Sequence, residues 1–206
     1  MKILKIVVVL AAIMVAMLTA CSPRLAEEGT TSEVPVISPE VLPTTELTQQ
    51  PGYEPVPEES LKNGTYVIDG QPVHLVDGTA ETEAAPGSAS MQVTRYFGYT
   101  VNIDLNADGL MDAAFLLQQE TGGSGEFYYV AAALQNEGGI LGTNAIFLGD
   151  RISPQSITAD LHDPAHFIVN YTDRKPAEPM SAQPSVDFSR VFKFENGSLV
   201  EVLPVP

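Results

Sequence analysis

The sequence predicts a mainly β protein, an antiparallel sandwich, barrel or curved sheet of about nine short strands that follows a disordered tether. Three observations support this fold class. From Asn63 onward, short apolar runs alternate with turn residues. Asp69-Gly70 and Asn196-Gly197 each separate two such runs, and these dipeptides favour two-residue hairpin turns. The preceding residues are rich in Pro and Glu and cannot form an apolar core.

The N-terminal residues 1–20 have the layout of a secretion signal. Two lysines precede an apolar run, residues 6–17, that is shorter than the roughly 20 residues of a membrane span. Leu18-Thr19-Ala20-Cys21 resembles the bacterial lipobox. The resemblance implies cleavage before Cys21 and diacylglycerol on its thiol. It therefore implies a lipoprotein of the bacterial cell envelope, in the outer membrane facing the periplasm of a Gram-negative host, and otherwise on the outer face of the cell membrane.

Residues 21–60 are predicted to be the lipidated cysteine and a disordered tether. Frequent Pro, Glu, Thr and Ser disfavour a folded core, and Pro and Glu favour an extended chain. Residues 61–206 are predicted to form a single β-rich domain, which is long enough to bury a core without crosslinks. Cys21 is the only cysteine of the 206 residues, so no disulfide can form within the chain.

The strand candidates follow from apolar runs bounded by turn residues. In chain order they are a hairpin over 66–76, then 91–102 with a break near Gly98, and then 113–119, 127–135, 144–148, 156–161, 167–172, 190–195 and 199–203. Val130-Ala-Ala-Ala-Leu134 has high helix propensity, but Tyr128 and Tyr129 favour a central strand. Residues 78–90 and 173–188 are predicted to be loops.

One stretch has the residue spacing of a metal site. Asp104, Asn106, Asp108 and Asp112 lie at positions 1, 3, 5 and 9, with Gly109 at position 6. Calcium takes six to eight oxygen ligands, and alternating oxygen side chains on a tight loop can converge on one ion. The Leu110 carbonyl can add a ligand at position 7. The alternative from the same residues is an ion-free turn, because Asn, Asp and Gly are turn formers.

This stretch resembles the Asp-x-Asn-x-Asp-Gly-x-x-Asp calcium loops of dockerins and of FG-GAP or VCBS repeats in secreted bacterial proteins. The resemblance implies Asp104, Asn106, Asp108 and Asp112 as ligands of a structural Ca²⁺. Phe115 stands where an EF-hand has its bidentate glutamate. The flanking residues favour strands, so we expect the loop to join two strands rather than two helices.

Charge restricts the partners. The formal net charge is −16, which argues against nucleic acid as a partner. The predicted partners are the membrane, through the anchor on Cys21, and an unknown envelope protein or polymer. Asp173, Arg174 and Lys175 form a basic spot in the predicted 173–188 loop, which could recognise a partner.

The sequence leads to a first expectation for function, a non-enzymatic binding or structural domain of the cell envelope, stabilised by calcium. No catalytic constellation is assigned from the spacing of residues. Two alternatives stay open. One is an envelope hydrolase acting on cell-wall or secreted polymers, which predicts two carboxylates facing each other in a pocket. The other is an inhibitor or accessory subunit of an envelope complex that uses the 173–188 loop.

Overall fold

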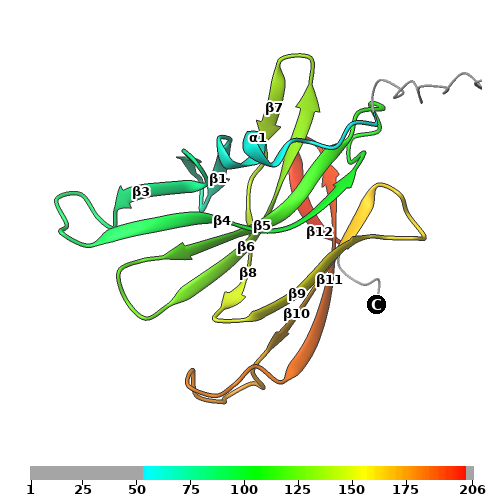
Figure 1. Ribbon diagram of the computed structural model, residues 1–206. Helices are drawn as coiled ribbons and strands as arrows, with labels where there is room; N and C mark the ends of the chain where they lie inside the picture. Colours follow the sequence, from blue (N-terminus) through cyan, green and yellow to red (C-terminus); the bar gives the residue numbers. More distant parts are fainter. Residues whose placement is uncertain (1–52, 203–206) are drawn as a thin grey trace, which may run out of the picture. The chain divides into compact units, whose positions relative to one another are not determined.

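A computed structural model describes residues 53–202, which contain twelve strands and one short helix (Figure 1). The strands form three antiparallel sheets, which confirms the predicted mainly β fold. The predicted signal, Cys21 and most of the predicted tether lie outside the described residues.

The first part of the described chain is a small layer made of a helix and a hairpin. It contains α1 (Glu58–Lys62), β1 (Thr65–Ile68) and β2 (Gln71–His74), and we call these three elements the hairpin layer. The predicted turn at Asp69-Gly70 joins the strands, with φ angles of 50° and 78°. Helix α1 crosses residue 61, the predicted start of the domain, and both Val56 and Leu61 are buried. No helix in residues 53–202 is long and apolar enough to cross a membrane.

The middle layer, which we call the central sheet, has six strands. They are β3 (Thr79–Glu83), β4 (Met91–Ile103), β5 (Asp112–Glu120), β6 (Glu126–Asn136), β7 (Gly139–Gly142) and β8 (Ile146–Asp150). Their order is β3-β4-β5-β6-β7, and β8 also pairs with β6. Strands β3 and β7 were not predicted. The first lies in the predicted 78–90 loop and is mostly exposed, and the second has four residues, of which two are glycines.

The remaining four strands form the outer sheet. They are β9 (Ser153–Ala159), β10 (His166–Asp173), β11 (Val186–Glu195) and β12 (Ser198–Val202), in the order β12-β11-β10-β9. Asp173 pairs with Val186, so the predicted long loop is shorter than 173–188. The predicted hairpin turn at Asn196-Gly197 joins β11 and β12, with φ angles of 52° and 83°.

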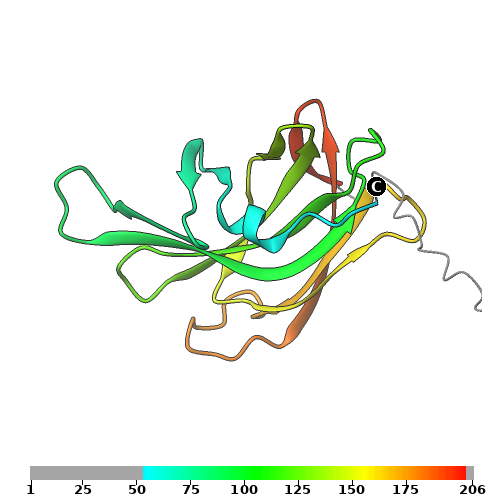
Figure 2. The ribbon, with the colours of Figure 1, turned by 45° about the horizontal axis from the view of Figure 1, so that its top comes forward.

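Strands β5 and β6 are buried on both faces, because a layer packs on each side of the central sheet (Figure 2). Successive side chains of a strand point to opposite faces. Ala114 and Leu116 therefore belong to the core shared with the outer sheet, and Phe115 and Leu117 to the core shared with the hairpin layer. Of the arrangements left open by the sequence, the structure is a sandwich with one additional layer.

Strand β4 bends at the break predicted near Gly98. Gly98 and Tyr99 have φ angles of 91° and 54°, and the pairing with β5 shifts register on both sides of Gly98. Such bulges increase the local bend and twist of a strand. Beyond the bend, β4 continues to Ile103, whose side chain is buried between the central and outer sheets.

Asn144, between β7 and β8, connects all three layers. Its backbone forms a bridge with Val67 of β1. Its side chain bonds both polar backbone groups of Leu199 in β12, because Nδ2 donates to the Leu199 carbonyl at 3.0 Å and Oδ1 accepts from the Leu199 N–H at 2.8 Å. One residue therefore links the hairpin layer, the central sheet and the outer sheet.

Candidate functional site

The predicted metal loop joins β4 to β5, and its flanks are strands as expected. Ile103 and Leu105 on one side are buried in the core that faces the outer sheet. Ala107 and Gly109 adopt left-handed φ angles of 59° and 87°, which turn the chain back on itself within a few residues. The loop therefore has a buried base and an exposed tip.

Three of the predicted ligands gather at the exposed tip. The Asp104 carboxylate accepts the N–H groups of Asp108 at 3.2 Å and Gly109 at 3.0 Å. The Asp108 carboxylate accepts from the Leu110 N–H at 2.8 Å and from Asn106 Nδ2 at 2.9 Å. These bonds fold the loop around its own carboxylates, as Asx turns do.

Asp112 lies at the base of the loop, away from these groups. Its side chain is fully buried, and its two oxygens accept the N–H groups of Leu105 at 2.9 Å and Gln135 at 2.8 Å. Burial raises the pKa of Asp112 from 3.8 to about 6. The two N–H donors act in the opposite direction, and the charges of Asp108 and Asp104 add to the rise. Asp112 therefore fastens the loop to β6 from behind.

The five residues that the calcium motif predicts as ligands do not all lie together in the structure. Asp104, Asn106 and Asp108 are brought together, Leu110 donates its N–H to Asp108, and Asp112 faces the protein interior. Within residues 53–202, no three side chains of His, Cys, Asp or Glu are grouped so that they could hold a metal ion.

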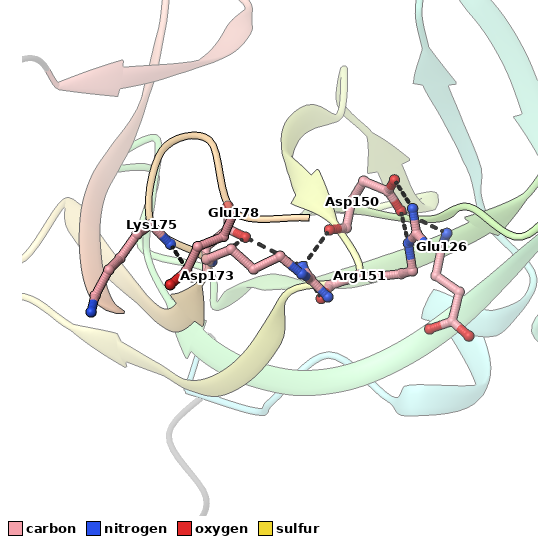
Figure 3. A network of polar contacts seen from close by, with 7 residues as sticks. Glu126, Asp150, Arg151, Asp173, Lys175 and Glu178 are labelled. Atoms are coloured by element: carbon pink, nitrogen blue, oxygen red, sulfur yellow. Dashed lines mark hydrogen bonds and ion pairs between the residues drawn. The ribbon is translucent and has the colours of Figure 1, made fainter. Parts of the chain in front are cut away.

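The predicted partner loop has a structural residue at its centre. The side chain of Arg174 is only 9% exposed, and Nη1 donates to the carbonyls of Asp150 at 3.3 Å and Arg151 at 3.0 Å. Arg151 has a φ angle of 51°, so these carbonyls belong to the tight turn between β8 and β9. Asp173 pairs with Arg174, and the Lys175 N–H donates to the Glu178 carboxylate at 2.9 Å. Of the three predicted residues, only Lys175 is exposed, and its amine points away from the network (Figure 3).

The same network holds the end of β6. Asp150 accepts from the Glu126 N–H at 3.0 Å and from two nitrogens of Arg151 at 3.1 and 3.0 Å (Figure 3). Partial burial alone would raise the pKa of Asp150, but the Arg151 guanidinium and the Glu126 N–H lower it. These contacts stabilise the turn and the neighbouring strand end.

A cleft that was not predicted lies on the face of the central sheet that carries the hairpin layer. It has a volume of about 810 Å³, within the range of small-molecule pockets, about 300–1,000 Å³. One wall comes from β1, β2 and their turn, the opposite wall from β3 and the turn after it, and the floor from the central sheet. The lining residues are Ile68, Asp69, Gln71, Pro72, Val73, Thr82, Glu83, Ala84, Ala85, Pro86, Gln92, Gln119, Thr121, Phe127 and Tyr129.

The floor of the cleft combines aromatic rings with a buried amide. Gln119 is 3% exposed, and its Nε2 donates to Thr94 Oγ1 at 3.1 Å. Phe127 lies opposite Gln119 in the strand register. The Tyr129 hydroxyl donates to Asp69 Oδ2 at 3.4 Å, and burial, reinforced by Asp69, raises the pKa of Tyr129 to about 12.

The aromatic floor continues beyond the cleft onto β8. The ring of Phe147 lies 5.5 Å from that of Tyr129 and 6.3 Å from that of Phe127, and Phe147 is 47% exposed. We call Phe127, Tyr129 and Phe147 the aromatic ledge.

A scan against protein-family models and searches of curated proteins and of solved structures found no match to this chain.

Proposed function

We propose that this chain is a lipid-anchored, non-enzymatic binding protein of the bacterial cell envelope. The cleft between the hairpin layer and β3 is the observation that carries the binding role. It is preformed, it is lined by aromatic rings, amides and two carboxylates, and it is built on paired strands rather than on long loops. The anchor on Cys21 rests on the secretion signal and on the resemblance to the lipobox.

The cleft contains two carboxylates, which is the composition that the hydrolase alternative requires. Each accepts a hydrogen bond from the protein. Asp69 accepts from the Tyr129 hydroxyl, and Glu83 accepts from the Gly87 N–H at 2.8 Å. Each carboxylate therefore has one contact within the protein, and the proposed binding role rests on the aromatic rings and amides of the cleft.

The anchor is tested with the full chain expressed in a bacterial host that acylates lipoproteins. We expect the wild-type chain to incorporate radiolabelled palmitate and to sediment with membranes. The Cys21→Ala chain should incorporate none. Two acyl chains attach a protein stably, because each buried methylene contributes about 0.8 kcal/mol. A wild-type chain without label in such a host would contradict the proposal.

Calcium at the 104–112 loop is a second part of this proposal. Asp104, Asn106 and Asp108 would supply side-chain oxygens and Leu110 its carbonyl, with water completing the coordination. Carboxylate oxygens that accept an N–H keep further lone pairs for a cation. Asp112 would act from the buried side, where it holds the loop in place.

The calcium site is tested by thermal melting, in calcium or in chelator, of the Cys21→Ala chain expressed from residue 21, without the apolar run 6–17. At a free calcium concentration of 100 times Kd, we expect about 2.7 kcal/mol of stabilisation, which raises Tm by about 5–10 °C. A chain that also carries Asp104→Ala and Asp108→Ala should show no rise. Equal melting temperatures with and without calcium in the parent chain would reduce the loop to an ion-free turn.

A further inference from the structure

We infer that the cleft binds an uncharged oligosaccharide, on the aromatic ledge and on the amides that line the floor. This inference rests on the proposed binding function and names the chemistry of the ligand. The lining contains no Lys, Arg or His, so it offers no cationic partner for phosphate, sulfate or carboxylate groups. Its two carboxylates are already hydrogen-bonded within the protein.

The aromatic ledge provides the apolar part of the site. Phe127 and Phe147 are partly exposed, and the Phe147 ring lies next to both other rings, while Tyr129 is buried in the core under the hairpin layer. The rings come from β6 and β8, where Tyr129 and Phe147 are paired across the two strands. Sugar rings present flat C–H faces, and these pack on the faces of aromatic side chains. A ledge that runs out of the cleft suits a chain of several sugar units.

Three glutamine side chains provide the polar part. Gln71, Gln92 and Gln119 all line the cleft. An amide has both donors and acceptors, which matches the hydroxyl groups of sugars. Thr94 fixes the amide of Gln119, and within residues 53–202 no group donates to its Oε1. This oxygen is therefore held in place to accept a hydrogen bond from a ligand hydroxyl.

An extended peptide is the competing occupant, because β3 is an edge strand beside the cleft. A peptide added to that edge would be bound mainly by backbone groups of β3. It would leave the aromatic ledge without a role, because β4 and β5 lie between β3 and the strands β6 and β8 that carry the ledge. The combination of partly exposed rings, a fixed amide and a lining without cations favours the saccharide.

The inference is tested by isothermal titration calorimetry of the soluble Cys21→Ala chain with cellohexaose, maltohexaose and N-acetylchitohexaose. We expect at least one of the three to bind. Phe147→Ala should weaken Kd about tenfold, and Gln92→Ala should weaken it as well. Phe188→Ala is the matched control, because Phe188 is 40% exposed but belongs to the outer sheet. Melting curves of each variant verify folding.

Three outcomes would overturn the inference. These are no heat with any of the three saccharides at low-millimolar concentration, equal weakening by Phe147→Ala and Phe188→Ala, and binding of an extended peptide in place of the saccharides. In each case palmitate labelling of the full chain still reports on the anchor separately. A chain that incorporates palmitate but does not bind saccharides would refute this inference without contradicting the proposed lipid anchor.

Discussion

Asp112→Ala is expected to lower the free energy of unfolding by about 2–5 kcal/mol, even in the presence of chelator. The substitution removes the acceptor of two backbone N–H groups, those of Leu105 and Gln135. A buried donor without a partner costs about 1–3 kcal/mol. The substitution also removes the connection between the base of the loop, at Leu105, and the end of β6, at Gln135. Urea unfolding of the Cys21→Ala chain measures the effect.

Asp108→Ala is the matched control for this prediction. Asp108 accepts its hydrogen bonds at the exposed tip of the loop, where water can replace them. We expect a change of less than about 1 kcal/mol in chelator. An Asp112→Ala chain that is as stable as the Asp108→Ala chain would show that the buried carboxylate does not fasten the loop.

The raised pKa of Asp112 also makes the stability of the folded chain depend on pH. Its carboxyl binds a proton more tightly in the folded chain, with a pKa of about 6, than at its ordinary value of 3.8. The stabilisation from this proton is therefore complete below pH 3.8 and is lost as the pH rises through 6. In chelator, the Tm of the chain with Asp112, relative to that of Asp112→Asn, should fall as the pH rises from about 4 to 6 and level off above that. A constant difference would contradict the assignment.

Phe115→Ala is expected to lower the free energy of unfolding by about 3–5 kcal/mol. Phe115 is fully buried where β5 meets the hairpin layer, and its ring lies 5.1 Å from that of Tyr66 and 5.4 Å from that of Tyr96. Removal of the ring leaves a cavity that the strands around it cannot close. Tyr66 would then have one fewer partner for holding β1 against the central sheet. Urea unfolding again measures the loss.

Phe188→Ala serves as the comparison, because it removes the same ring from a partly exposed position on β11. We expect it to cost less than half as much as Phe115→Ala, since less apolar surface is buried there. Similar losses for the two variants would mean that the hairpin layer contributes little to the stability of the domain.

The sequence predicted the central strands well because their residues are unambiguous. Tyr128 and Tyr129 favoured a strand against the helix propensity of the alanines that follow, and β6 is indeed a central strand. The structure explains those alanines. Ala131 and Ala133 face the hairpin layer and Ala132 faces the outer sheet, all fully buried, and small side chains let three layers approach closely.

Other features could not be predicted, because they depend on tertiary contacts. Strand β3 exists by pairing with β4, although Thr79–Glu83 is largely exposed and has no apolar alternation. The cleft combines walls from residues 68–73 and 82–86 with a floor that includes residues 119–129, which lie far away in the sequence. Arg174 was interpreted as a surface cation, yet it is buried because the carbonyls of the β8–β9 turn need its donors. Gln119 is one of three consecutive polar residues at the end of β5, so the sequence carried no specific signal for the cleft.

The side chain of Asn144 reduces the tendency of neighbouring molecules to aggregate through their strand edges. An open strand edge offers unpaired N–H and C=O groups to any other chain, and this promotes edge-to-edge aggregation. By bonding both groups of Leu199, Asn144 occupies a position on the outer edge of β12 with an amide instead of another strand. With the lipid anchor proposed above, neighbouring molecules would share one membrane surface and meet at high local density. A strand edge that is occupied within each molecule reduces their tendency to join into larger sheets.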